Sequence, residues 1–128
     1  MLAMVAHQTI KTSKAQISII EDNICYFHYQ GNTHLELDDY LENHKVYNEL
    51  NVDQNLKILA EFPKHVSFSV EARKYAEMAA LDTIAQAIVI HSLPQRIIAR
   101  FYHRMRKNDF PVKVFNKKHE AVAWLLTF

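Results

Sequence analysis

The chain has 128 residues, 49% of them hydrophobic, and its 15 basic and 14 acidic side chains leave a formal net charge of +1. This length suits one domain with its own core, and the charge argues against a surface devoted to nucleic acid. The single cysteine cannot form an internal disulfide, nothing resembles a secretory signal, and no apolar run approaches the roughly 18 residues of a membrane span. We therefore expect a cytoplasmic protein, soluble or in peripheral contact with a membrane or lipid.

Glycine is the most informative residue count, because Gly31 is the only glycine in the chain. Phosphate-binding loops, dinucleotide-binding fingerprints and nucleophile elbows each need several glycines. Their usual forms are therefore excluded, and with them much of the common repertoire of nucleotide binding and hydrolysis.

The first 14 residues show no sustained hydrophobic period and contain small, polar and basic side chains. We interpret residues 1–14 as a flexible N-terminal arm or a late-ordering edge. A single domain is expected to span residues 15–128.

Two strands joined by a tight turn are predicted next. Residues 16–21 and 24–30 are rich in Ile, Tyr and Phe, and Asp22-Asn23 between them is typical of a turn between antiparallel strands. Alternation in the second strand directs Cys25 toward the core. We interpret Cys25 as a packing residue rather than a nucleophile, because free cysteine behaves as a small buried hydrophobe.

From Thr33 to Leu50 the hydrophobic spacing changes to three and four, which predicts a helix. Its predicted inner face carries Leu37, Tyr40, Leu41, His44 and Tyr47. Its first half is acidic, with Glu36, Asp38, Asp39 and Glu42. These acids could ligate a metal, but a solvated helix start is the favoured interpretation, because no compact set of histidine and carboxylate ligands accompanies them.

The central prediction is a strand, a loop and a helix between Leu56 and Ala80. The short apolar run over 56–62 predicts a strand covered on both faces. Ser69 is placed to cap the following helix, and Glu71 lies in the first turn, where the helix dipole stabilises a carboxylate by roughly 0.3–1 kcal/mol. Ligands and partners commonly bind at such junctions in open α/β sheets.

Two further strand and helix pairs complete the chain. Residues 85–91 predict a central parallel strand, and Ser92 is placed to begin a helix that extends to residue 107. Residues 112–115 predict a last strand, and Asn116 is expected to cap the final helix. That helix is expected to bury Ala121, Val122, Trp124 and Leu125.

The predicted element order is therefore ββαβαβαβα. Strands that alternate with single helices indicate right-handed crossovers, so we expect a compact α/β domain with a mostly parallel mixed sheet. This order predicts about five strands and about four helices.

The predicted helix over 92–107 carries a basic ridge, which consists of Arg96, Arg100, Arg104 and Lys107. The ridge could bind phosphates, an acidic partner or an anionic membrane surface. A solvated face whose arginine stems cover apolar neighbours is the favoured interpretation. The ridge lacks the regularly spaced aromatic residues of a single-strand binder, so a nucleic acid is not expected as partner.

No catalytic motif is evident, and we expect a non-enzymatic protein with no metal and no cofactor. The eight histidines are dispersed without an HExxH pattern. His65 and His91 could meet in space, although surface or capped positions are favoured for both. Ser67 and Ser69 lie near His65 and Glu61 in the sequence, but no oxyanion device accompanies this set of nucleophile, base and acid.

Three groups of residues are distinctive when they are taken together. They are Glu71-Ala72-Arg73 with Tyr75, Ser92-x-Pro94 followed by Ile98, Ala99 and Phe101, and Pro111-x-Lys113-x-Phe115 leading to Glu120-Ala121 and Trp124-Leu125. With the preceding hairpin, they resemble the uncharacterised bacterial STAS-like domains, also described as STAS/SEC14-like, which are related to anti-sigma-factor antagonists. The resemblance covers residues 15–126 in outline.

The resemblance implies a domain that works by binding other proteins, with a regulatory role. In the antagonists, a kinase phosphorylates a serine at the start of the helix after the third strand, and the phosphate decides whether a partner binds. Here that motif reads Ser69-Val70-Glu71-Ala72, and Glu71 stands where the phosphorylated serine would be. A fixed carboxylate there argues against the phosphorylation switch, because a phosphate on Ser69 would be repelled. The SEC14 side of the resemblance implies the alternative of a small-molecule or lipid-binding module.

We therefore predict a protein-interaction domain that uses the 61–69 loop and the start of the next helix to bind an unidentified protein. The candidate residues are Glu61, Lys64, His65, Ser67, Ser69, Glu71 and Arg73. The basic ridge is a secondary surface, for a partner or for assembly of a homo-oligomer.

Overall fold

A computed structural model describes residues 9–52, 54–78, 81–92, 94, 96, 99 and 110–128. The strands of its main sheet are β1 (Thr9–Lys11), β2 (Ala15–Ile20), β3 (Ile24–Tyr29), β5 (Lys57–Phe62), β7 (Gln86–Ile90) and β8 (Val112–Phe115). A second sheet pairs β4 (Thr33–Leu35) with β6 (Val66–Phe68). The helices within the described residues are α2 (Leu37–Leu50), α3 (Val70–Met78) and α5 (Lys118–Leu125).

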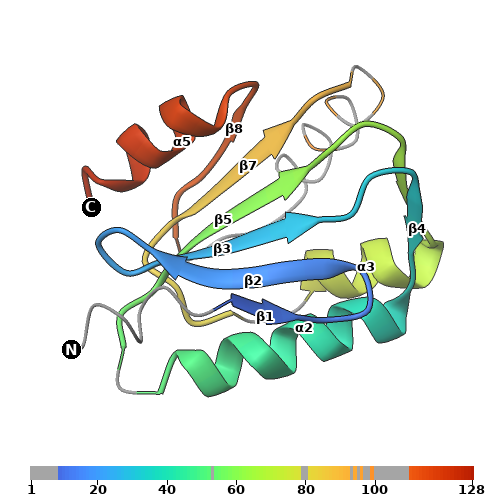
Figure 1. Ribbon diagram of the computed structural model, residues 1–128, viewed down its shortest axis with the longest axis horizontal. Helices are drawn as coiled ribbons and strands as arrows, with labels where there is room; N and C mark the ends of the chain where they lie inside the picture. Colours follow the sequence, from blue (N-terminus) through green and yellow to red (C-terminus); the bar gives the residue numbers. More distant parts are fainter. Residues whose placement is uncertain are drawn as a thin grey trace.

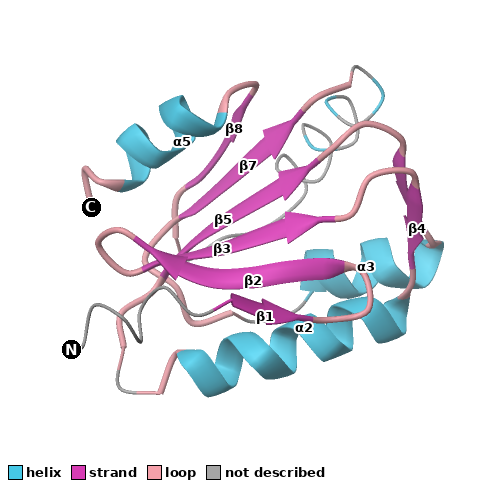
Figure 2. Cartoon of the chain, viewed as in Figure 1, coloured by secondary structure: helices cyan, strands magenta, loops and turns pink. Residues whose placement is uncertain are grey.

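The main sheet has the order β1-β2-β3-β5-β7-β8 (Figure 1). The first three strands are antiparallel neighbours, and β3, β5, β7 and β8 are parallel. Helices α2 and α3 cover one face, while α5 lies on the other, near β7 and β8 (Figure 2). The predicted α/β class with a mostly parallel mixed sheet is confirmed, with six strands in the main sheet.

The predicted hairpin is present, because β2 and β3 pair from Ala15 with Tyr29 to Ile20 with Ile24. Asp22 and Asn23 have φ angles of 53° and 63°, a left-handed conformation that these two residue types tolerate better than most.

The sheet begins earlier than the predicted domain boundary at residue 15. Strand β1 pairs antiparallel with β2, with Ile10 opposite Ile17, so Thr9–Lys11 form an edge strand, which is the second alternative given for residues 1–14, and are not part of a flexible arm. A strand of three residues is too short to show a hydrophobic period, which is why the sequence pattern did not decide between the two alternatives. Residues 1–8 lie outside the described residues.

The helix predicted from Thr33 begins four residues later, at Leu37. Residues Thr33–Leu35 instead form β4, which pairs in parallel with β6 from inside the predicted 61–69 loop. The helix start is fixed by a capping box in which the backbone N–H of Glu36 donates to Asp39 Oδ2 at 2.8 Å. Leu41, predicted on the inner face, is 43% exposed.

The core has two parts because the central strands are buried on both faces. Cys25 and Ile58 face α2 and α3, whereas Leu59 faces Ala121 and Leu125 of α5. Cys25 is fully buried, and burial raises the pKa of its thiol to about 12, so the interpretation of Cys25 as a packing residue is confirmed.

One predicted helix cap is confirmed and another is wrong. Ser69 Oγ accepts a hydrogen bond from the backbone N–H of Ala72 at 3.0 Å, which confirms the predicted cap of α3. Asn116 was predicted to cap the last helix, but the cap position belongs to Lys117, without a side-chain hydrogen bond. The helix predicted over 92–107 lies largely outside the described residues. None of the described helices is long and apolar enough to cross a membrane.

Candidate functional site

The structure divides the predicted contact residues between two faces of the main sheet. Successive side chains of a strand point to opposite faces. In β5, Ala60 and Phe62 pack toward α2 and α3, so Glu61 between them points to the face that carries α5. The other predicted residues follow β5, near the β4–β6 pair and the start of α3.

The turn between β5 and β6 presents two of the predicted residues to solvent. Lys64 and His65 are both exposed, and His65 has a left-handed φ of 64°. Two backbone hydrogen bonds hold the turn, from Asn32 N–H to the Lys64 carbonyl oxygen at 3.2 Å and from Thr33 N–H to the His65 carbonyl oxygen at 3.1 Å. The turn is therefore hydrogen-bonded to the segment that follows β3.

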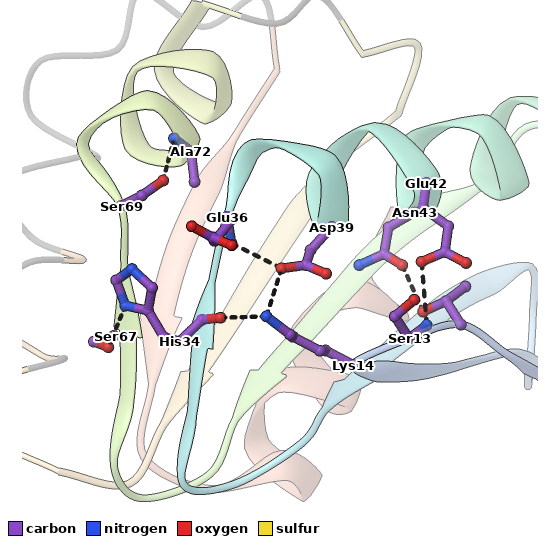
Figure 3. A network of polar contacts seen from close by, with 11 residues as sticks. Ser13, Lys14, His34, Glu36, Asp39, Glu42, Asn43, Ser67, Ser69 and Ala72 are labelled. Atoms are coloured by element: carbon purple, nitrogen blue, oxygen red, sulfur yellow. Dashed lines mark hydrogen bonds and ion pairs between the residues drawn. The ribbon is translucent and has the colours of Figure 1, made fainter.

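Ser67 is exposed on β6, and its partner is a histidine that the sequence interpretation had not selected. His34 is opposite Ser67 in the β4–β6 register, and its Nδ1 lies 2.8 Å from Ser67 Oγ (Figure 3). This pair could not be anticipated once Thr33–Leu35 had been interpreted as helix. The only signal for this pair in the sequence was the alternation of inward and outward side chains in two short strands.

The first turn of α3 carries exposed apolar and charged side chains. Val70 is 51% exposed, and Glu71 and Arg73 are exposed as well. Ser69 is only partly exposed, and its hydroxyl is used for the cap of the helix (Figure 3). We define the β6–α3 surface as Lys64, His65, Ser67, Val70 and Glu71.

The acidic start of α2 is linked through Lys14 to strand β4, which pairs with β6. Asp39 is buried, accepts the hydrogen bond from the Glu36 backbone and pairs with Lys14 Nζ at 3.0 Å. The same ammonium donates to the His34 carbonyl oxygen at 2.6 Å (Figure 3). Within the described residues, no group of three or more His, Cys, Asp or Glu could hold a metal ion.

Glu61 forms a separate polar cluster at the carboxyl ends of the parallel strands. Tyr26 OH donates to Glu61 Oε1, and His91 Nε2 lies 2.6 Å from Glu61 Oε2. His28 stacks on the Tyr26 ring with centroids 5.5 Å apart, and Lys118 Nζ lies 4.2 Å from the centroid of that ring. The Glu61 cluster consists of these five residues.

Electrostatics hold the Glu61 carboxylate in its charged form. Burial is the largest single influence on its pKa and acts to raise it. Hydrogen bonds from Tyr26 and His91, with the nearby charges of His28 and His91, outweigh burial and leave the pKa below its ordinary value. The pKa of Tyr26 is raised, first by burial and then by the hydrogen bond and charge of Glu61.

The suggested set of nucleophile, base and acid is not assembled among the described contacts. Ser67 pairs with His34, Ser69 caps α3, and Glu61 pairs with Tyr26 and His91. His65 lies on its own exposed turn and has no contact with His91 among those described.

The basic ridge stays a prediction. Arg96 is partly buried, and its backbone N–H donates to the Ser92 carbonyl oxygen at 3.1 Å, as in a first helical turn. The other ridge residues, Arg100, Arg104 and Lys107, lie outside the described residues.

The arrangement of the sheet and helices defines a SpoIIAA-like fold. The chain is similar to the crystal structure of an uncharacterised protein from the DUF3478 family of Shewanella loihica PV-4, which is described as having a SpoIIAA-like fold. The TM-score is 0.59 at 17% sequence identity, and the match covers 91% of this chain and 98% of that chain. This likeness confirms the predicted STAS-like fold.

The family is shown by a separate match. Residues 18–128 match the model of the family described as Domain of unknown function (DUF7793), and the chain belongs to that family. A comparison with curated proteins gives no match.

Proposed function

We propose that this protein is a non-enzymatic, cytoplasmic regulatory domain that binds another protein through the β6–α3 surface. The observation that carries this proposal is the arrangement of an exposed apolar side chain, Val70, among exposed charged and hydrogen-bonding groups. Protein interfaces commonly combine an apolar centre with a polar rim. The SpoIIAA-like fold supports the proposal, because it is the fold of the antagonists that the sequence resembles.

The backbone beneath this surface is already ordered. The turn at Lys64 and His65 is tied to the segment after β3, and Ser67 is fixed by its contact with His34. A surface that is ordered before binding loses less conformational entropy when a partner binds. This preorganisation favours a specific contact.

The contact is proposed to be constitutive rather than switched by phosphate. Glu71 is exposed in the first turn of α3, where its negative charge is favourable. Ser69 uses its hydroxyl to cap the same helix, and a phosphate there would be repelled by the nearby carboxylate of Glu71. Binding is therefore expected without phosphorylation.

The test is a capture experiment from cells that produce the protein, with the triple variant Lys64→Glu, Ser67→Ala and Glu71→Lys. The two charge changes cancel, so the net charge is kept. A matched control is Lys45→Glu with Glu49→Lys, two exposed residues of α2. We expect a protein that the wild type and the control capture to be lost by the triple variant. Full retention by a folded triple variant would refute the assignment of the surface, and a solution mass measurement shows whether the partner is a second copy.

A further inference from the structure

A cavity of about 90 Å³ lies between the main sheet and the helices α2 and α3. One water occupies about 30 Å³ in the liquid, so the cavity is larger than a vacancy for a single water. Its walls include residues of β3, β5, β7, α2 and α3. It is on the opposite side of the sheet from the Glu61 cluster and is distinct from the β6–α3 surface.

Aromatic rings supply much of the wall. Tyr29 and Phe62 are stacked with centroids 4.6 Å apart, and Phe68 meets Phe62 edge to face at 5.4 Å. These rings fix one another in place and offer flat apolar surfaces. An apolar group is therefore the appropriate occupant for the body of the cavity.

Arg73 brings a positive charge to the cavity. It lines the cavity and yet is exposed, so the cavity reaches the solvent beside this side chain. The guanidinium has no ion pair among the described residues. An unpaired arginine at the mouth of an apolar cavity favours a carboxylate, because its planar donors match both carboxylate oxygens.

Gln86 contributes a second polar group. Its Oε1 atom is buried and has no hydrogen-bond partner among the described residues, although its side chain lines the cavity. A buried polar atom without a partner is costly, and a bound ligand would satisfy it. A hydroxyl group suits this position in either orientation of the amide, because it can donate or accept.

The two polar groups come from different walls of the cavity, Gln86 from β7 and Arg73 from α3. Gln86 is the first residue of β7 and pairs with Ile58, near the start of β5. Arg73 is on α3, which follows β6, and Phe68 of β6 contacts Phe62 at the end of β5. We propose that the cavity binds a short-chain carboxylate that carries a hydroxyl group. The apolar chain lies among the rings, the carboxylate binds Arg73 at the mouth, and the hydroxyl group binds Gln86.

The proposal is tested by NMR titration of the whole protein with three probes of equal chain length. They are 4-hydroxybutanoate, butanoate, which lacks the hydroxyl group, and butane-1,4-diol, which lacks the carboxylate. We expect saturable shifts of the amide signals of β5 and α3. Butanoate and the diol should each bind about tenfold more weakly than 4-hydroxybutanoate. Butanoate lacks the hydrogen bond to Gln86, and the diol lacks the charged hydrogen bonds to Arg73.

Two variants locate the polar contacts. Arg73→Gln should weaken binding of both carboxylates about tenfold and leave the diol unaffected, while Gln86→Leu should remove the preference for 4-hydroxybutanoate over butanoate. Lys74→Gln is the matched control, because Lys74 is the neighbouring exposed cation on α3 and does not line the cavity.

Well-dispersed spectra must show that each variant is folded, and Arg73→Lys replaces Arg73→Gln if the latter unfolds. Lysine keeps the charge but not the paired donors, so an intermediate loss is expected. The proposal fails if none of the probes gives saturable shifts up to its solubility limit. It also fails if the carboxylates bind the folded Arg73 variant as they bind the wild type.

Discussion

Glu61 and His91 are joined across the end of the sheet by a 2.6 Å contact between Glu61 Oε2 and His91 Nε2. The contact ties β5 to the residue that follows β7, at the carboxyl ends of two neighbouring parallel strands. Only 12% of the Glu61 side chain is exposed, so its charge depends on these partners rather than on solvent.

Stability should therefore depend on pH through Glu61. The pKa of Glu61 is lower in the folded protein than its ordinary value of 4.5, so the unfolded chain takes up the proton first as the pH falls. The stabilisation is complete above the unfolded pKa and is lost as the pH falls through the folded pKa. Glu61→Gln should cost about 1.5–3 kcal/mol near neutral pH and less at about pH 3.

Urea unfolding of the wild type and of Glu61→Gln at both pH values measures this change. Glu49→Gln, at an exposed position of α2, is the control and should show no comparable pH-dependent difference. An equal loss of unfolding free energy at both pH values would contradict the prediction.

Ser69→Ala should destabilise the protein by about 1 kcal/mol, because the backbone N–H of Ala72 loses its acceptor. Ser69→Asp keeps an acceptor at the cap and should recover most of that loss. Ser67→Ala is the comparison, since the bond from Ser67 to His34 is exposed and should contribute less than about 0.5 kcal/mol. Urea unfolding gives these values, and an equal effect of the two alanine substitutions would argue against the cap.

Cys25 should react slowly with thiol reagents while the protein is folded. The thiol is fully buried and its pKa is raised to about 12, so the thiolate is scarce near pH 8. The ordinary pKa of about 8.5 returns in urea, and labelling there should be at least about a hundredfold faster. Mass spectrometry at timed intervals measures both rates. Comparable rates would mean that Cys25 is accessible in the folded state.

Lys57 and Asp22 should respond unequally to substitution. Lys57 is 3% exposed and its Nζ lies 2.9 Å from Asp22 Oδ2, while the Asp22 side chain is 61% exposed. Asp22→Asn leaves a buried ammonium without a counter-charge and should cost about 1–3 kcal/mol. Lys57→Met removes the buried charge itself and should cost less. Thermal or urea unfolding of both variants decides the order, and a larger loss for Lys57→Met would overturn it.

Local signals in the sequence were sufficient for much of the fold. The apolar run of β5, the turn at Asp22 and Asn23 and the cap at Ser69 each depend on neighbouring residues, and all three are present. Strands β4 and β6 depend on pairing between segments more than thirty residues apart, and three residues show no period. The predicted helix start at Thr33 was wrong for this reason.

The candidate site was less accessible to sequence reasoning. Glu61 was placed with Ser67 and Glu71 because they are close in sequence, although alternation in β5 turns Glu61 to the other face. The Ser67 and His34 pair required the β4–β6 register. The cavity could not be predicted, because Tyr29 and Phe62 would have the same pattern in a fully packed core.

Strand β6 has two faces, and they are directed to different surroundings. Ser67 faces solvent within the β6–α3 surface, whereas the next residue, Phe68, forms a wall of the cavity. If the Phe68 ring is displaced, the backbone of β6 has to shift with it, and that backbone also carries Ser67. Occupancy of the cavity and affinity for a partner are therefore thermodynamically linked wherever that backbone moves, and each would alter the other by the same factor.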